Sequence, residues 1–314
     1  MLQFALAFLL VLECSISADI DHRKVALEQL HSMSDQELDQ DLKLQDFFGS
    51  IYVINLPHAT TRLARMTQDL KKIGVHNFTV WPAVNGRNPQ EVPEALWRKM
   101  SLNWRVIDLS STEGEKRLAR QFQGETGCYL SHYRLLQHVK AQYDLAQEQW
   151  RIAADPVEKD TAAKEMEKYS SVLILEDDNG FGIVQSDHKN VSLAGVGKLL
   201  RLAFSELPDD WDMLYLMAQS ISPSRRQSPH LKQLKFGMLM NAYAVSHRMY
   251  GDIIRHLSSI DDLATEALTP VDNAVGELHT THQCYAIYPS IALQADGESQ
   301  IIDQMTKGPR QVQP

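Results

Sequence analysis

The chain has 314 residues, of which 44% are hydrophobic and 23% charged, so it can bury a substantial core and is not a disordered chain. Asp and Glu (40) outnumber Lys and Arg (31), and the net charge of −9 argues against a nucleic-acid binder, whose binding surface would be basic. The three cysteines are too few for a disulfide scaffold, and no local Cys/His cluster has the spacing of a zinc site.

The N-terminus predicts a secretory signal peptide over residues 1–18. Residues 1–12 form an almost uninterrupted apolar run, and small residues follow it. An uncleaved anchor or a buried N-terminal strand remains the alternative. Because the run is shorter than the roughly 20 residues that a membrane-spanning helix needs, and no later segment is long enough, we expect no transmembrane span. A genuine signal peptide implies the secretory pathway, lumenal or exported, and its absence implies the cytoplasm.

The next segments predict a strand, a helix and a second strand. A polar, acidic lead-in over residues 19–49 is expected to be helical. Residues 51–56 are apolar and β-branched, as in a buried strand, and the helical spacing of Leu63, Met66, Leu70 and Ile73 ends at Gly74. A second strand follows at 78–81. This succession is the βαβ pattern of a parallel sheet.

The rest of the chain repeats strand and helix patterns. Further strands are predicted at 171–175, 213–217, 242–245 and 284–289, with helical patterns between them. Residues 141–168 are polar and read as an inserted pair of helices. Residues 303–314 are expected to form a flexible tail. We therefore expect an α/β fold with a mostly parallel central sheet flanked by helices, in a single domain over residues 50–302.

Three carboxylates, Glu176, Asp177 and Asp178, come directly after the most apolar strand. Ligands of open α/β sheets bind beyond the carboxyl ends of the strands, where this triplet falls. On extended backbone Glu176 and Asp178 point the same way and are candidate ligands of one Mn²⁺ or Mg²⁺, while Asp177 faces elsewhere. The alternative is a solvated acidic turn that caps a following helix.

Two further residues are candidates for chemistry, each with a structural alternative. His132 lies in an apolar helix stripe with Cys128, Leu135 and Val139, and it is either a core histidine or a partner of the acidic triplet. Asp272 follows Pro270 at the predicted start of a helix over 273–278, where it is either a helix cap or a general base. Whether Cys128 pairs with Cys284 stays open.

Read in order, these motifs resemble one family, the family 25 glycosyltransferases, which include lipooligosaccharide galactosyltransferases of bacteria and procollagen galactosyltransferases of animals. The matching segments are YVINL (52–56) with Arg62 and Arg65, WPAVNG (81–86), GETGC (124–128) with LSH (130–132), LILEDD (173–178), WD (211–212), AYAVS (242–246), PVD (270–272) and ESQI (298–301). The resemblance covers roughly residues 50 to 302 and rests on six or more motifs in register.

The resemblance implies a GT-A-like fold and a metal-dependent, inverting transfer of a sugar, expected to be galactose, from a UDP-sugar to a hydroxyl of a glycan or protein acceptor. Site residues carried over from the family are Asn55, Leu56, Arg62, Ala83, Asn85 and Asp177 for the donor, Glu176 and Asp178 for the metal, His132 for the acceptor or an indirect role, and Asp272 as the base. Asn85 replaces the commoner aspartate of the family's PAVDG motif, and the segment between His132 and Glu176 is longer than usual. A catalytically lapsed nucleotide-sugar- or glycan-binding protein is the alternative. A phosphotransferase or nucleotide hydrolase is disfavoured because no Walker-type phosphate loop is present.

Overall fold

The computed structural model describes residues 44, 47–101, 112–184, 191–192, 195–220, 225–261, 267–294, 297–298 and 305–306. The predicted signal peptide at 1–18, nearly all of the lead-in at 19–49 and most of the tail at 303–314 lie outside these residues. So does most of the ESQI segment.

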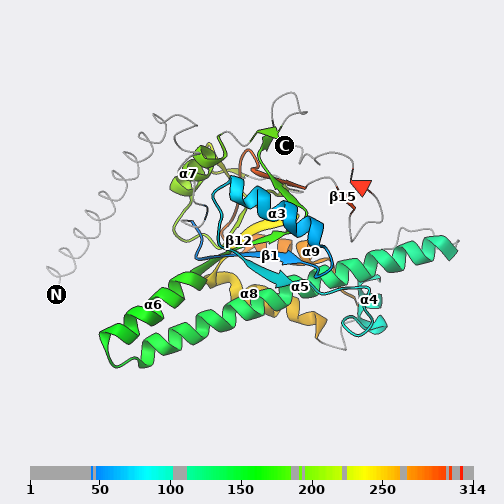
Figure 1. The fold of residues 1–314 in the computed structure, drawn as a ribbon, viewed down its shortest axis with the longest axis horizontal. Helices are drawn as coiled ribbons and strands as arrows, with labels where there is room; N and C mark the ends of the chain where they lie inside the picture. Colours follow the sequence, from blue (N-terminus) through cyan, green and yellow to red (C-terminus); the bar gives the residue numbers. More distant parts are fainter. Residues whose placement is uncertain are drawn as a thin grey trace.

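An eight-stranded mixed sheet forms the centre of the fold (Figure 1). Its strands are, in spatial order, β2 (Thr79–Pro82), β1 (Ser50–Asn55), β3 (Ser171–Glu176), β12 (Ala242–Ser246), β7 (Met213–Tyr215), β13 (Cys284–Ile287), β10 (Leu231–Gln233) and β9 (Arg225–Arg226). β12 and β10 run against their neighbours, while the other six strands share one direction. The predicted α/β class is confirmed, and most strands point one way, as in a GT-A-like sheet.

Helices cover both faces of this sheet. They are α3 (Thr60–Lys72), α4 (Glu94–Ser101), α5 (Thr112–Ile152), α6 (Pro156–Ser170), α7 (Val196–Glu206), α8 (His247–Leu257) and α9 (Val271–Glu277), with short 3₁₀ turns at Ser258–Ile260 and Leu278–Thr280. Four two-stranded ribbons complete the described structure: β4 (Asn179–Phe181) with β14 (Ala292–Gln294), β8 (Gln219–Ser220) with β11 (Gly237–Met238), β5 (Ile183–Val184) with β6 (Val191–Ser192), and β15 (Gly297–Glu298) with β16 (Met305–Thr306).

The sheet separates two hydrophobic cores, as the apolar strand sequences require. Side chains alternate between the faces of a strand, so Tyr52 and Ile54 of β1 enter one core and Ile51 and Val53 enter the other. The first core contains side chains of α4, α5, α8 and α9, and the second contains side chains of α3 and α7. Strands buried on both faces read as continuous apolar runs, which is why the sequence located them.

The predicted βαβ unit is present at the N-terminal end of the described chain. β1 pairs in parallel with β2 and with β3. Gly74 has a φ of 77°, a left-handed conformation that favours glycine, and it follows the end of α3 as predicted. The carboxyl ends of β1, β2 and β3 therefore lie together at one edge of the sheet.

The predicted polar insertion is a helical hairpin formed by the C-terminal part of α5 and by α6, and it extends away from the sheet (Figure 1). Asp155 starts α6, because its Oδ1 accepts hydrogen bonds from the N–H groups of Val157 at 2.8 Å and Glu158 at 2.9 Å. Pro156 occupies the first turn, where its missing N–H costs nothing. The predicted break at Asp155-Pro156 is thus the turn between the helices.

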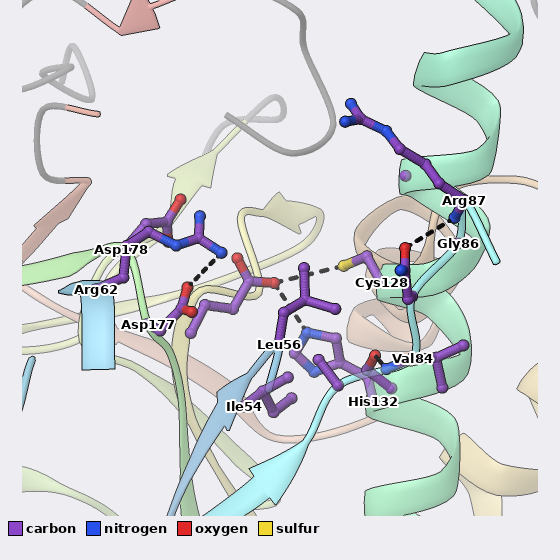
Figure 2. Close-up of a pocket in the computed structure, with 15 residues that line it drawn as sticks. Ile54, Leu56, Arg62, Val84, Gly86, Arg87, Cys128, His132, Asp177 and Asp178 are labelled. Carbon is purple, nitrogen blue, oxygen red and sulfur yellow. Dashed lines mark hydrogen bonds and ion pairs between the residues drawn. The ribbon is translucent and has the colours of Figure 1, made fainter. Parts of the chain in front are cut away.

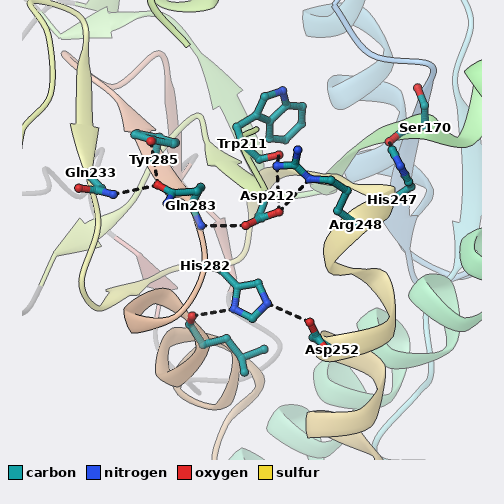
Figure 3. Close-up of polar contacts among 11 residues, drawn as sticks. Ser170, Trp211, Asp212, Gln233, His247, Arg248, Asp252, His282, Gln283 and Tyr285 are labelled. Carbon is teal, nitrogen blue, oxygen red and sulfur yellow. Dashed lines mark hydrogen bonds and ion pairs between the residues drawn. The ribbon is translucent and has the colours of Figure 1, made fainter. Parts of the chain in front are cut away.

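Asp212 of the WD motif has a structural role. Its Oδ2 accepts from the N–H of Gln283 at 2.8 Å, and its Oδ1 accepts from Arg248 on α8 (Figure 3). His282 bonds Asp252 of α8 at 3.0 Å through Nε2. These contacts tie β7, the start of β13 and α8 together at the opposite end of the strands from the acidic triplet.

Cys128 and Cys284 are both free thiols, so the structure does not contain the disulfide whose formation the sequence left open. In the parts of the chain that are described, no helix combines the length and the apolar character needed to cross a membrane.

Candidate active site

A pocket opens where β1, β2 and β3 end. Leu56 follows β1, Ala83 and Asn85 follow β2, and the acidic triplet ends β3, so three consecutive neighbours in the sheet contribute to one site. The pocket holds about 740 Å³ of empty space, part of it open to solvent. Its lining consists of Ile54, Leu56, Arg62, Ala83, Val84, Asn85, Gly86, Arg87, Gly124, Cys128, Ser131, His132, Glu176, Asp177 and Asp178 (Figure 2).

Asp177 is held by arginines of α3. Arg62 forms an ion pair with its carboxylate at 3.0 Å, and Arg65 donates to its backbone oxygen at 3.2 Å. Burial raises the pKa of Asp177 to about 7, and the charge of Arg62 opposes this shift. The neighbouring Asp178 and Glu176 raise the pKa further. Negative charge is therefore concentrated at this edge of the sheet.

The backbone leaves the extended conformation at Asp177, so the alternation on which the sequence prediction relied stops at Glu176. Asp177 and Asp178 form a turn, and the next element is β4, not a helix. The acidic triplet is consequently not the cap of a helix. Asp177 faces Arg62, with which it forms an ion pair.

Glu176 contacts two side chains of α5 instead of pairing with an arginine. His132 Nε2 lies 3.0 Å from Glu176 Oε1, and the thiol of Cys128 donates to the same oxygen at 3.4 Å. The other ring nitrogen of His132, Nδ1, lies 2.8 Å from the hydroxyl of Tyr243 on β12. His132 is fully buried, and the structure places it beside the acidic triplet, which was the functional alternative.

Cys128 shares the electrostatic environment of the carboxylates. Burial is the largest cause that raises the pKa of its thiol, and the negative charge of Glu176 is the next. Asp272 and Asp178 raise this pKa as well. The thiol is therefore protonated at neutral pH in the metal-free protein, in agreement with its role as a hydrogen-bond donor.

The turn after β2 packs directly on the backbone of α5. A Cβ atom on Gly86 would lie 1.7 Å from the carbonyl oxygen of Gln123, and a Cβ on Gly127 would lie 2.7 Å from the nitrogen of Gly86. Ser131 bridges the two segments, since its Oγ accepts from the N–H of Val84 at 2.8 Å and donates to the carbonyl of Gly127 at 2.6 Å. One packing contact between the turn after β2 and α5 thus depends on Gly86, Gly127 and Ser131, which come from the WPAVNG, GETGC and LSH motifs.

Asn85 retains the turn-forming function of the aspartate that it replaces. Its Oδ1 accepts from the N–H of Arg87 at 3.1 Å, and its own N–H donates to Glu91 at 2.9 Å. An amide oxygen and a carboxylate oxygen both accept this hydrogen bond, so the substitution removes a charge but keeps the turn.

Asp272 lies in the first turn of α9, which starts at Val271. The predicted start at residue 273 was too late, and the helix cap is Pro270. The Asp272 carboxylate accepts from the N–H of Asn273 at 2.9 Å and of Leu239 at 3.4 Å. Burial raises the pKa of Asp272, these hydrogen bonds oppose the rise, and the charge of Glu176 adds to it. Leu239 adopts a φ of 75°, which is uncommon for a residue with a side chain.

The structure brings most of the predicted site residues together. Leu56, Arg62, Ala83, Asn85, Asp177, His132, Glu176 and Asp178 all line the pocket. Asn55 and Asp272 are not among the lining residues. Asn55 is buried at the end of β1, and its Nδ2 donates to the carbonyl of Leu56 at 2.7 Å. It therefore acts on the pocket through the backbone of Leu56, which lines it.

Sequence reasoning missed three contributors to the site. Arg87 and Ser131 line the pocket, and Tyr243 orients His132 from the neighbouring strand. Ser131 could have been predicted from the sequence, because it follows Gly127 by four residues and therefore lies on the same helix face. Tyr243 could not, since it lies 111 positions from His132 in the sequence.

Residues 48–146 match the family model described as glycosyltransferase family 25 (LPS biosynthesis protein). The match confirms the predicted family resemblance, and it spans β1, α3, β2, α4 and most of α5, including Leu56, Arg62, Ala83, Asn85 and His132. The acidic triplet and Asp272 lie beyond it. None of the curated proteins compared with the chain matches it.

Proposed function

We propose that the chain is a glycosyltransferase of family 25, whose model residues 48–146 match, and that it transfers galactose from UDP-galactose to a hydroxyl group of a glycan or protein acceptor. The proposed reaction depends on a divalent cation and inverts the configuration at the anomeric carbon of the sugar. The observation that supports it best is the pocket at the ends of β1, β2 and β3, in which a carboxylate triplet lies beside an arginine.

The residues present suit a hard divalent cation. Glu176 and Asp178 line the same pocket and offer carboxylate oxygens, the ligands that Mn²⁺ and Mg²⁺ prefer. Burial is the main cause of the raised pKa of the neighbouring Asp177, and the charges of Asp178 and Glu176 add to it; a cation in the pocket would offset this repulsion. Buried Oδ2 of Asp177 makes no hydrogen bond within the described structure, which again fits a ligand in the pocket. A bound cation would neutralise the diphosphate leaving group of the donor.

The donor is proposed to lie along the ends of β1 and β2. Leu56 and Ala83 supply an apolar surface for the uracil ring of the donor, and the turn at Asn85 closes one side of the pocket. Arg62 reaches the pocket while paired with Asp177, so it can orient this carboxylate toward a ribose or sugar hydroxyl. Exposed Arg87 extends the positive charge at the pocket mouth.

Asp272 is proposed as the base that removes the proton of the acceptor hydroxyl. Its carboxylate is partly buried and electrostatically coupled to Glu176 and Cys128, so it lies close to the triplet although it does not line the pocket. Its raised pKa brings its proton affinity nearer to neutrality, which favours general base catalysis. In an inverting transfer the acceptor oxygen displaces the diphosphate in one step, so the reaction requires one base on the acceptor side.

Calorimetric titration of the chain with UDP, with and without Mn²⁺, tests the donor site. We expect Mn²⁺-dependent binding in the wild type, and its loss in Asp178→Ala with the fold intact. The matched control is Asp160→Ala on α6, whose carboxylate pairs with Lys164 of the same helix at the hairpin surface. Unchanged Mn²⁺-dependent affinity in Asp178→Ala would exclude Asp178 as a cation ligand.

Transfer itself is tested with a panel of UDP-sugars and acceptors, with UDP release as the readout. Asp272→Asn should keep donor binding and lose transfer, because an amide cannot take the acceptor proton. Full transfer by this variant would remove Asp272 as the base. Donor binding without turnover of any sugar would instead support the lapsed, binding-only alternative.

A further inference from the structure

Cys128, His132 and Glu176 present a sulfur, a nitrogen and an oxygen atom that all lie within 4.8 Å of one another. Cys128 and His132 are four residues apart on α5, so their side chains leave the same face of the helix (Figure 2). Glu176 approaches them from the end of β3. We propose that these three side chains form a binding site for Zn²⁺, which shares Glu176 with the proposed hard-cation site but differs from it in its sulfur and nitrogen ligands.

The distances fit tetrahedral coordination. Zn–N and Zn–O bonds of about 2.0 Å and a Zn–S bond of about 2.3 Å separate tetrahedral ligand atoms by about 3.3–3.6 Å. Cys128 Sγ lies 3.4 Å from Glu176 Oε1, and His132 Nε2 lies 3.0 Å from the same oxygen. These two distances are within a few tenths of an ångström of the tetrahedral values, and Cys128 Sγ and His132 Nε2 lie within 4.8 Å of each other.

Tyr243 completes the site as the partner that orients the histidine. Histidines that bind metals commonly donate their other ring N–H to a neighbouring acceptor, which leaves the coordinating nitrogen unprotonated. The hydroxyl of Tyr243, 2.8 Å from His132 Nδ1, can accept this hydrogen by rotating its own. No heavy atom has to move for His132 to present a lone pair from Nε2.

The donor set selects the ion. Thiolate and imidazole ligands favour Zn²⁺, whereas Mn²⁺ and Mg²⁺ prefer oxygen alone. On binding, the ion takes the thiol sulfur as a thiolate and the thiol proton passes to solvent. All three ligands line the pocket, so its space leaves a fourth coordination position for water or an oxygen of a small molecule. The site goes beyond sugar transfer because it needs neither donor nor acceptor.

Co²⁺ is the probe, because it replaces Zn²⁺ in such sites and gives an absorption band when a thiolate binds it. The full chain, stripped with a chelator, should bind one Co²⁺ with a thiolate band that Zn²⁺ abolishes. Cys128→Ser should lose the band. Because the chain has only three cysteines, the double variant Cys14→Ser/Cys284→Ser keeps Cys128 as its sole thiol, and it should retain the band in full.

The double variant leaves the site itself unchanged, so the test does not depend on the folding of Cys128→Ser. Absence of the band in the wild type or in the double variant would overturn the proposal. A band of equal strength in Cys128→Ser would also overturn it, since the thiolate would then belong to another cysteine. None of these readouts involves UDP or transfer, so failure here is distinguishable from failure of the proposed function.

Discussion

Alanine at Gly127 should separate the turn after β2 from α5, and the cost can be worked out from the close approach of the two backbones. A new Cβ would lie 2.7 Å from the nitrogen of Gly86 and 2.8 Å from the carbonyl oxygen of Val84. Both neighbours are backbone atoms, which cannot rotate away as a side chain can. Overpacking of this kind costs about 1–3 kcal/mol, while glycine to alanine inside a helix gains about 1 kcal/mol.

The matched control is Gly251→Ala in the interior of α8. There the new Cβ would meet only the end of the Lys140 side chain, at an ordinary contact distance of 3.7 Å. The control should therefore gain about 1 kcal/mol in the free energy of unfolding, while Gly127→Ala should range from neutral to a loss of about 2 kcal/mol. The two variants should differ by about 1–3 kcal/mol.

Urea denaturation of both variants measures this difference, and UDP titration in the presence of Mn²⁺ reports the functional result. Displacement of the turn moves Ala83 and Asn85, which line the pocket, so Gly127→Ala should also weaken UDP binding while Gly251→Ala leaves it unchanged. Equal stabilisation by both substitutions would refute the reasoning, because it would mean that no backbone obstructs the methyl group at residue 127.

Three further changes have defined outcomes. Ser131→Ala leaves the N–H of Val84 without its acceptor and should cost about 1–3 kcal/mol of unfolding free energy by urea denaturation; a loss below the error of that measurement would contradict the role of the bridge. Burial lowers the pKa of His279 to about 4, well below its unfolded value of about 6.5, so the unfolded chain binds more protons in this interval and stability should fall by about 3 kcal/mol as the pH drops from 7 to 4. His279 lies within the core, where its Nδ1 accepts a hydrogen bond from the N–H of Gly237, and His279→Gln should flatten this part of the pH profile; an unchanged slope would show that other groups cause it. Asp155→Ala removes the acceptor for two N–H groups at the start of α6 and should cost about 1 kcal/mol, with UDP affinity unaffected because the hairpin is remote from the pocket; reduced affinity would show that the hairpin contributes to the donor site.

The sequence by itself located the elements that local patterns define. The strand at 171–175 was evident because a strand buried on both faces is continuously apolar, and the end of α3 was evident because Gly74 suits the left-handed conformation after a helix. The predicted βαβ unit over residues 51–81 placed Leu56 and Ala83 at one edge of the sheet, while the neighbouring position of Asp177 became known only from the pairing of β1 with β3.

Local patterns also misplaced some features. The expectation that Glu176 and Asp178 point the same way assumed that the strand continues past Glu176, but the chain turns at Asp177. The start of α9 was predicted two residues late, because Pro270 was expected to place Asp272 in the cap position. The antiparallel direction of β12 could not be predicted from the sequence, since a buried strand is an apolar run whether it is parallel or antiparallel to its neighbours.

The partners of the site residues were decided by the tertiary structure alone. His132 reaches Glu176 across 44 positions and Tyr243 across 111, and Gly86 meets Gln123 only because the turn after β2 lies against α5. The sequence shows no zinc spacing, yet folding adds Glu176 to Cys128 and His132 and completes a set of three ligands. The physical reason is that hydrophobic periodicity records which face of an element is buried, whereas contacts between elements depend on how those faces pack, which no local pattern contains.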